Sequence, residues 1–453
     1  MSESASWALH AATALLPGGL QSDVRVRVEG GVISAVDVGV GPQPGDERCE
    51  FLVPAMANLH SHAFQRAMAG LAEMRGPGTD SFWSWRNVMY ETALSLDPDD
   101  VEAIAAQLYM EMLEAGFGRV GEFHYLHHDR DGRPYANPAE MAERIAAAAA
   151  ATGINLTLLP VFYAHSGFGG APPSEGQRRF VHTPEQFATL MSGCRALLGE
   201  MPGAVLGIAP HSLRAATPEE IIAILPLAEG GPVHIHVAEQ VKEVEDCIAY
   251  CGARPIQFLL SEAPVDGRWC LIHATHMDRG ETRAMAASGA IAGLCPITEA
   301  NLGDGIFSIR PFLEAGGRYG VGSDSNVLIS VTGELRQLEY SARLGLRERN
   351  VIAEPNGSTG LNLYARALTG GAAALGVRGG IEGGHAADLV ALDVDALSYL
   401  PAEHSLDHWI FAGGASVDRV WIAGRRRVEA GRHLERDAIA SRFTSAMKRL
   451  REA

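Results

Sequence analysis

Lysine is almost absent from this sequence, and so is any excess of positive charge. Only Lys242 and Lys448 are lysines, the chain has no long run of basic residues, and its formal net charge is −17. Binding to nucleic acid or to an anionic membrane surface relies on clustered Lys and Arg side chains. The composition therefore disfavours both functions and favours work on small molecules.

Paired cysteines and long apolar runs are also missing. The six cysteines of the 453-residue chain include no CxxC pair, so neither a disulfide scaffold nor a zinc knuckle is indicated. No segment reaches 18 consecutive apolar residues, and no basic stretch precedes an apolar one at the start. With 47% hydrophobic and 20% charged residues, the composition is that of a packed globular protein. We expect a soluble protein of the reducing cytoplasm.

Strand-like alternation of apolar and polar residues marks both ends of the chain. Residues 24–40 alternate on either side of a turn at Glu29, Gly30 and Gly31, which predicts two antiparallel strands. The same alternation returns in residues 387–394 and 417–431. Two β-rich ends are therefore expected to flank a different middle.

The middle of the chain alternates short apolar runs with longer helical patterns. Eight runs are predicted as strands, at residues 51–58, 120–124, 154–162, 205–210, 233–237, 270–274, 290–294 and 319–323. The predicted helices include residues 99–115, 139–152, 184–198, 218–228, 279–288 and 307–315. Eight strand–helix units are typical of a (β/α)8 barrel, whose active site lies where the strands end. Between the first two strands, residues 65–96 are predicted as a long loop near that site.

Residues of the types that bind metals gather at the ends of the predicted strands. His60 and His62 follow the first strand, His236 and His273 end the fifth and sixth, and Asp324 follows the eighth. Residues two apart in an extended segment face the same side, so both imidazoles of the HxH pair can reach one ion. Nitrogen and oxygen ligands of this kind suit Zn²⁺ or a related divalent metal with an open position for water.

A carboxylate accompanies the third of these histidines. Glu239 lies three residues after His236, in the order HVAE. A carboxylate just beyond a metal ligand can accept a proton from the attacking water and later deliver it to a leaving nitrogen. If His236 were not a ligand, Glu239 would simply begin a helix, so the two assignments depend on each other.

The order HxH, HxxE, His and Asp extends over nearly the whole chain and resembles the mononuclear deaminase branch of the amidohydrolase superfamily. The resemblance implies an α/β fold, in which a (β/α)8 TIM-like barrel carries a small β-sandwich domain formed from both termini. We accordingly expect the two parts of the β-sandwich at residues 1–54 and 376–435. The metal-dependent barrel would occupy residues 55–375, and a C-terminal helix residues 436–453.

The same resemblance bears on the cofactor and on assembly. Binuclear members of the superfamily bridge two metals with a carboxylated lysine, but no lysine occurs between His62 and His236. We therefore expect one divalent ion, Zn²⁺ in the first place and Fe²⁺ as the alternative. The superfamily also suggests a homodimer.

Three stretches resemble the formimidoylglutamate deiminase family in particular: VPAMANLHSHAFQRAMAGLAE at residues 53–73, GEFHYLHHD at 121–129 and APHSLRA at 209–215. Members of that family belong to histidine degradation and hydrolyse N-formimidoyl-L-glutamate to N-formyl-L-glutamate and ammonia. The resemblance implies metal binding by His60, His62, His236 and Asp324. It implies proton transfer and orientation of the nucleophile by Glu239 and His273, with Asp324 beside the reacting centre.

A dicarboxylate substrate needs forked cationic donors that stay charged, which arginine supplies. Arg86 lies in the long loop after the first strand, and Arg214 lies just after the fourth. Gln65, Tyr125 and His211 are at neighbouring strand ends and can add hydrogen bonds. The family resemblance assigns all five to the glutamate part of the substrate.

Two alternatives stay open at this point. A nucleobase deaminase of the same superfamily, acting on a guanine-like or cytosine-like substrate, would hold a flat neutral ring by stacking, for which Trp83 and Trp85 are candidates. The two arginines argue against it. A barrel can also persist as a non-catalytic binding protein, since fold alone does not fix function.

Overall fold

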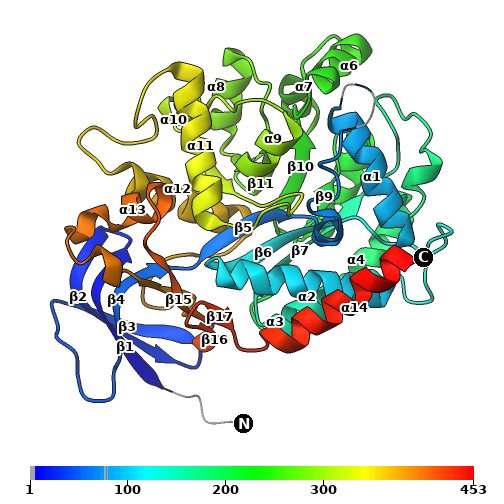
Figure 1. Cartoon of the computed structure of the whole chain (residues 1–453). Helices are drawn as coiled ribbons and strands as arrows, with labels where there is room; N and C mark the ends of the chain where they lie inside the picture. Colours follow the sequence, from blue (N-terminus) through cyan, green and yellow to red (C-terminus); the bar gives the residue numbers. More distant parts are fainter. Residues whose placement is uncertain (1–5, 76–77, 79, 453) are drawn as a thin grey trace.

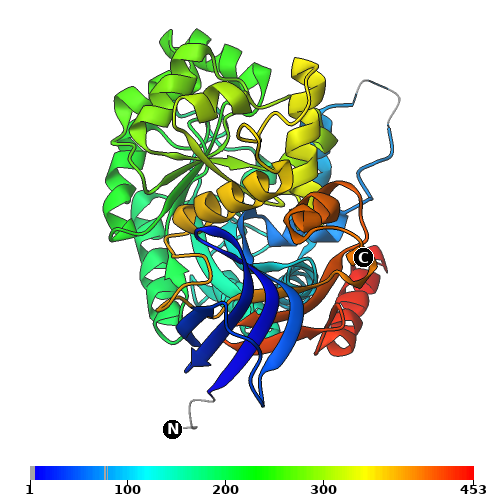
Figure 2. The same cartoon turned by 90° about the vertical axis from the view of Figure 1, so that its left-hand side faces the viewer.

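Parallel strands from the middle of the chain close into a barrel (Figures 1 and 2). The computed structural model describes residues 6–75, 78 and 80–452. One sheet runs β5-β6-β7-β8, with β9 bonded to β7, and another runs β10-β11-β12-β13. Parallel bridges from Ile208 to Val233 and from Ser61 to Asp324 join the two sheets into a ring. The strands are β5 (Met56–Ser61), β6 (Phe117–His124), β7 (Asn155–Phe162), β8 (Val205–Leu206), β9 (Ala209–Pro210), β10 (Val233–Val237), β11 (Trp269–His273), β12 (Ile291–Leu294) and β13 (Arg318–Val321).

Helices that lie between these strands or follow them in the chain cover the outside of the barrel (Figure 1). Thr183 and Thr217 start two of them, because each hydroxyl accepts a backbone N–H of the first turn and a proline follows at the first helical position. The helices are α2 (Pro98–Glu114), α3 (Glu140–Thr152), α4 (Pro184–Gly199), α5 (Pro218–Ile224), α6 (Val241–Cys251), α7 (Pro255–Glu262), α8 (Arg279–Ser288), α9 (Pro296–Leu302), α10 (Ile309–Glu314), α11 (Val331–Leu346), α12 (Thr359–Ala374) and α13 (Ser405–Phe411).

Strands from both ends of the chain form a second, smaller unit below the barrel in Figure 2. Its single mixed sheet has the order β17-β16-β15-β14-β4-β1-β2-β3. Apolar side chains on this sheet, including Leu9, Val26, Leu389 and Trp421, make a core of their own. The strands are β1 (Trp7–Leu16), β2 (Gly19–Glu29), β3 (Val32–Val38), β4 (Glu47–Pro54), β14 (Leu389–Asp393), β15 (Ser416–Ile422), β16 (Arg425–Glu429) and β17 (Arg432–His433).

The last helix, α14 (Arg436–Glu452), runs along α2 on the barrel's outer surface (Figure 1). Within the residues that the structure describes, no helix has both the length and the apolar character to cross a membrane.

The barrel and the β-rich extra unit are as the sequence predicts, but three segments differ in detail. The run 51–58 does not form one strand: its first part ends β4 in the terminal sheet, and its last part lies in β5 of the barrel. Both parts are buried, so the run reads as one apolar segment, and Pro54 is the residue at which β4 ends. The run 205–210 is interrupted at Gly207, where a side chain would collide with the backbone of Pro232. The predicted loop 65–96 contains most of the 3-10 helix η1 (Ala63–Met68) and all of α1 (Phe82–Ser95).

Candidate metal centre and substrate pocket

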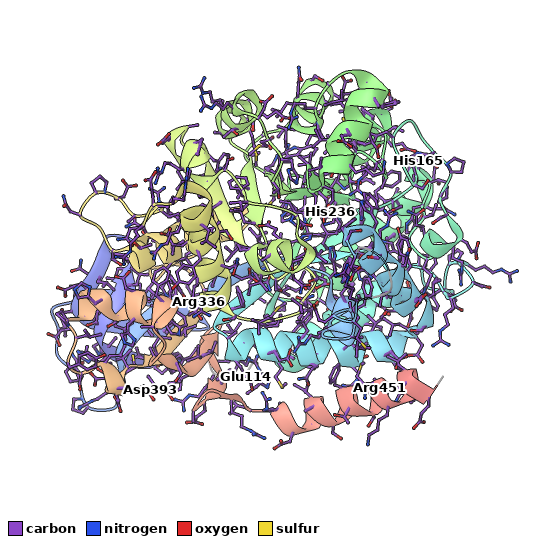
Figure 3. The ribbon with its side chains drawn as sticks, turned by 45° about the horizontal axis from the view of Figure 1, so that its top comes forward. Glu114, His165, His236, Arg336, Asp393 and Arg451 are labelled. Carbon is purple, nitrogen blue, oxygen red and sulfur yellow. The ribbon has the colours of Figure 1, made fainter. Side chains whose placement is uncertain are left out.

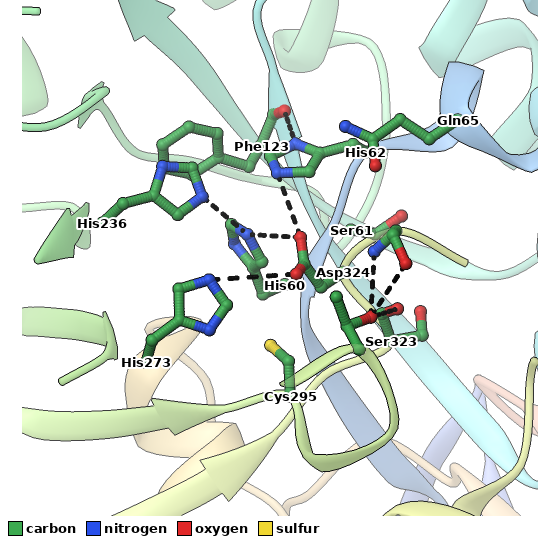
Figure 4. Close-up of polar contacts among 12 residues, drawn as sticks. His60, Ser61, His62, Gln65, Phe123, His236, His273, Cys295, Ser323 and Asp324 are labelled. Atoms are coloured by element: carbon green, nitrogen blue, oxygen red, sulfur yellow. Dashed lines mark hydrogen bonds and ion pairs between the residues drawn. The ribbon is translucent and has the colours of Figure 1, made fainter. Parts of the chain in front are cut away.

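Four of the predicted ligands converge at the carboxyl end of the barrel (Figure 4). One ligand atom from each of His60, His62, His236 and Asp324 lies within 4.8 Å of the other three, and all four residues are buried. Asp324 Oδ1 is 3.4 Å from His60 Nε2 and 3.2 Å from His62 Nε2. In Figure 3, His236 lies among the strands, whereas His165 lies on a peripheral loop.

Barrel closure positions the aspartate against the two histidines of β5. The backbone N–H of Asp324 donates to the carbonyl of His60 at 2.9 Å, and the N–H of His62 donates to the carbonyl of Asp324 at 3.1 Å. A side chain at Gly322 would lie 2.7 Å from the backbone nitrogen of His60, so glycine permits this close approach. Asp324 itself has a φ of 46°, a strained conformation of the kind found at functional sites.

The histidine tautomers suit a cation. His62 Nδ1 donates to the carbonyl of Phe123 at 2.9 Å, and His236 Nδ1 donates to that of His211 at 3.0 Å, so both Nε2 lone pairs point inward. Burial lowers the pKa of His60 to about 3 and that of His236 well below its ordinary value. Their Nε2 atoms are only 3.0 Å apart. Two neutral imidazoles facing each other beside a carboxylate fit a divalent metal ion.

The carboxylate of Asp324 stays ionised among these rings. Burial alone would raise its pKa, but the close approach of the His60 and His62 imidazoles outweighs that effect and holds the pKa well below the usual range. An ionised carboxylate is what a metal ligand requires.

Glu239 and His273 face the same centre from its rim. His273 Nε2 is 3.8 Å from Glu239 Oε1 and 3.8 Å from Asp324 Oδ2. Burial lowers the pKa of His273, but the carboxylates of Glu239 and Glu299 outweigh it and raise the pKa to about 10. His273 is therefore a hydrogen-bond donor. Burial raises the pKa of Glu239, which makes that carboxylate a better proton acceptor than an exposed glutamate.

The turn that carries Glu239 is held by a residue that sequence reasoning did not single out. The buried carboxylate of Glu243 accepts the backbone N–H of Ala238 at 3.1 Å and that of Glu239 at 3.0 Å. Ala238 has a φ of 53°, so these two hydrogen bonds stabilise a strained turn. The sequence feature that could have identified Glu243 is its position at the start of α6, four residues after Glu239.

Cys295 is another neighbour of the centre. With His273 and Asp324 it forms a second group whose ligand atoms lie within 4.8 Å of one another. Burial, together with the charge of Asp324, raises the pKa of its thiol well above the ordinary value. The thiolate form that binds metals is therefore disfavoured.

All five predicted substrate residues line one pocket together with Glu239 and His273. Gln65 donates to the hydroxyl of Tyr125 at 2.8 Å. The guanidinium of Arg214 is 3.7 Å from Glu239 Oε2, and that of Arg86 lies over the ring of Trp83 at 4.6 Å. The buried Nε atoms of both arginines have no hydrogen-bond partner among the described residues. The pocket thus holds two cationic groups with donors to spare.

The pocket also contains aromatic residues that sequence reasoning missed. Tyr90, Tyr163 and Phe180 line it, as does Trp85, which the sequence suggests only as a stacking residue. Tyr163 directly follows β7, the same strand-end signal that identified Tyr125. Tyr90 lies on α1, in the segment predicted as a loop, where no such signal exists.

Comparisons with known proteins agree with this fold. The sequence matches the model of the Amidohydrolase family over residues 51–427. A crystal structure of an amidohydrolase from Brucella melitensis has a TM-score of 0.97 and 58% identity, covering 98% of this chain and 99% of that one. A Zn-bound adenosine deaminase from Xanthomonas campestris shares the fold at 22% identity, with a TM-score of 0.81 and full coverage of both chains. The chain therefore belongs to the amidohydrolase family, whose members depend on metals.

A more particular likeness appears within that family. Residues 7–50 match the model described as the N-terminal domain of formimidoylglutamate deiminase HutF. The formimidoylglutamate deiminase of Pseudomonas aeruginosa is 50% identical over 98% of this chain and 99% of its own length. A 5-methylthioadenosine/S-adenosylhomocysteine deaminase of Natronomonas pharaonis is 28% identical, covering 90% of this chain and 88% of its own.

Proposed function

We propose that this protein is a formimidoylglutamate deiminase, which converts N-formimidoyl-L-glutamate and water to N-formyl-L-glutamate and ammonia in histidine degradation. The observation that carries the proposal is the presence of two arginines, in the same pocket as the candidate metal centre, whose Nε donors have no partner in the part of the chain that the structure describes. A substrate with two carboxylates and a hydrolysable amidine requires both features. The extensive similarity to the Pseudomonas aeruginosa deiminase supports the same conclusion.

We further propose a single divalent ion at this site, Zn²⁺ with Fe²⁺ as the alternative. His60, His62, His236 and Asp324 would hold it, since their ligand atoms converge. When bound, such an ion supplies Lewis acidity that makes water a nucleophile near neutral pH.

The protein's own residues would then move the protons. Glu239 accepts a proton from the attacking water, whose oxygen bonds to the formimidoyl carbon. His273 donates a hydrogen bond toward the negative charge that develops there, which its raised pKa of about 10 favours. Glu239 then passes both protons of the water in turn to the amidine nitrogen, the C–N bond breaks, and ammonia leaves while the water's oxygen remains as the carbonyl oxygen of the formyl group on the glutamate.

The remaining pocket residues would bind the glutamate part. Arg86 and Arg214 pair with the two carboxylates, and their binding energy holds the amidine against the reacting centre. Gln65, Tyr125 and His211 add hydrogen bonds around the same moiety.

The experiment that tests the function compares substrates. Ammonia release is measured with purified, metal-loaded protein on N-formimidoyl-L-glutamate, guanine, cytosine and adenosine. We expect turnover of the first alone. Faster turnover of a nucleobase would overturn the proposal in favour of the alternative deaminase, and no turnover of any substrate by protein containing one equivalent of metal would favour a binding protein.

The cytoplasmic location and the homodimer remain predictions from the sequence, as does the division of the chain at residues 54, 375 and 435. Light scattering of the purified protein measures the mass of the assembly directly.

A further inference from the structure

Two tyrosines in the substrate pocket share one amide behind them. Tyr90, on α1, and Tyr163, after β7, both line the pocket. Gln177, at the end of the 3-10 helix η2 (Glu175–Gln177), is buried outside that lining. Its Nε2 is 2.6 Å from the hydroxyl of Tyr163 and 3.2 Å from the hydroxyl of Tyr90.

The orientation of this amide follows from the chemistry of its other end. Gln177 Oε1 is 2.7 Å from the backbone nitrogen of Ser174, which can only donate. The atom facing Ser174 must therefore be the oxygen, and the atom facing the tyrosines must be the NH₂ group. Both phenol oxygens accept hydrogen bonds from Gln177, and each keeps its own hydrogen to donate.

Only one of those two hydrogens can be used within the pair. The hydroxyls of Tyr90 and Tyr163 are neighbours, so one can donate to the other, but both cannot do so at once. Among the described residues, neither hydroxyl donates to another protein acceptor. At least one O–H is left to donate into the pocket.

The surroundings favour an anionic acceptor for that hydrogen. Burial and the neighbouring Tyr90 raise the pKa of Tyr163, so its hydroxyl stays protonated although Arg214 and Arg86 act on it in the opposite direction. The guanidinium of Arg86 is also 5.6 Å from the centre of the Tyr90 ring. A neutral donor that lies near two arginines is suited to a carboxylate that they hold.

We propose that Tyr90 and Tyr163 are further substrate-binding residues, which together donate a hydrogen bond to a substrate carboxylate, and that Gln177 is the positioning residue that directs it. This inference rests on the proposed dicarboxylate substrate. Because Gln177 contacts Tyr90 of α1 and Tyr163 just after β7, it also links the helix that carries Arg86 to the barrel.

The test measures KM and kcat for N-formimidoyl-L-glutamate, together with inhibition by glutarate, a dicarboxylate without the amidine. For the double variant Tyr90→Phe/Tyr163→Phe we expect KM and the inhibition constant of glutarate to rise about 10- to 100-fold, the usual worth of a hydrogen bond to a charged group. We expect kcat and metal content to change by less than about threefold, because the reacting groups are untouched.

Gln177→Glu separates orientation from packing. Its carboxylate can still accept the Ser174 N–H but can only accept from the tyrosines, so both phenol hydrogens turn away from the substrate while both rings remain. We expect KM to rise at least as much as in the double phenylalanine variant. Gln177→Leu, which removes the donor without adding charge, should raise KM to an intermediate degree.

Tyr364→Phe is the matched control. Tyr364 is buried and its hydroxyl donates to the carbonyl of Pro54 at 2.8 Å, far along the chain from the pocket residues. The Tyr364→Phe variant also loses one tyrosine hydrogen bond, but outside the pocket, and we expect its KM to equal that of the wild type.

Unchanged KM and glutarate inhibition in the double phenylalanine variant would overturn the inference, as would a loss confined to kcat or to thermal stability. A wild-type protein that neither turns over N-formimidoyl-L-glutamate nor binds glutarate would instead overturn the proposed function, so the two failures are distinguishable.

Discussion

Replacement of Glu239 by glutamine tests the proposed chemistry most directly. The side chains have nearly the same shape, and Glu239 is not among the four converging ligands, so metal content should remain at the wild-type level. The variant cannot accept a proton from water or return one to the leaving nitrogen. General acid–base catalysis is worth about 10²- to 10⁴-fold, which corresponds to about 3–5 kcal/mol at ~1.4 kcal/mol per tenfold.

The neighbours of Glu239 predict where this loss will fall. Arg214 has a guanidinium nitrogen 3.7 Å from the Glu239 carboxylate, and the substitution removes that counter-charge. Arg214 is then free to pair with the substrate, so KM should stay level or fall while kcat drops. Glu245→Gln, an exposed change on α6, the helix that follows Glu239, is the control and should behave as the wild type.

The assay combines steady-state ammonia release with metal analysis of each protein. A Glu239→Gln variant that holds its metal and keeps kcat within tenfold of the wild type would refute the proton-transfer role. A variant that loses metal would show that Glu239 belongs to the ligand set.

Three further predictions follow from the same geometry. His236→Ala should lose metal and activity together, and a chelator should lower both activity and melting temperature of the wild type until Zn²⁺ is added back; activity without metal would contradict the site. Arg86→Lys and Arg214→Lys should raise KM about 10-fold or more, because an ammonium cannot reproduce the guanidinium fork; two unchanged specificity constants would remove both residues from substrate binding. Burial holds the pKa of His182 at about 3, so the unfolded chain binds a proton below pH ~6.5 that the folded one refuses. Urea unfolding should therefore show stability falling as pH drops from about 6.5 toward 3, with a shallower slope in His182→Gln; equal slopes would contradict this.

The placement of the candidate metal ligands was predictable from the sequence because it follows from local patterning. In a parallel barrel the strands end on one face, so polar side chains just after apolar runs must meet there. His60, His62, His236 and Asp324 all satisfy that condition, and in the structure their ligand atoms lie together. Arg214, directly after the fourth strand position, was found by the same rule.

Other features depend on tertiary contacts that no local pattern reveals. The run 51–58 reads as one strand, because the chain passes from one buried sheet to another without a polar interruption. Tyr90 joins the pocket only because α1 packs over the barrel end, and Gln177 matters only because it reaches two tyrosines from different elements. Glu243 is an ordinary helix residue in sequence and becomes important through the strained turn it supports.

The closure of the barrel also has a consequence for biosynthesis. His60 and Asp324 come from the first and last strands, and their backbones pair where the ring is completed. A chain still emerging from the ribosome therefore has no complete ligand set until its final barrel strand has been synthesised and docked. Metal binding would then indicate that the barrel has closed, and a bound ion would stabilise the closed barrel against opening between its first and last strands.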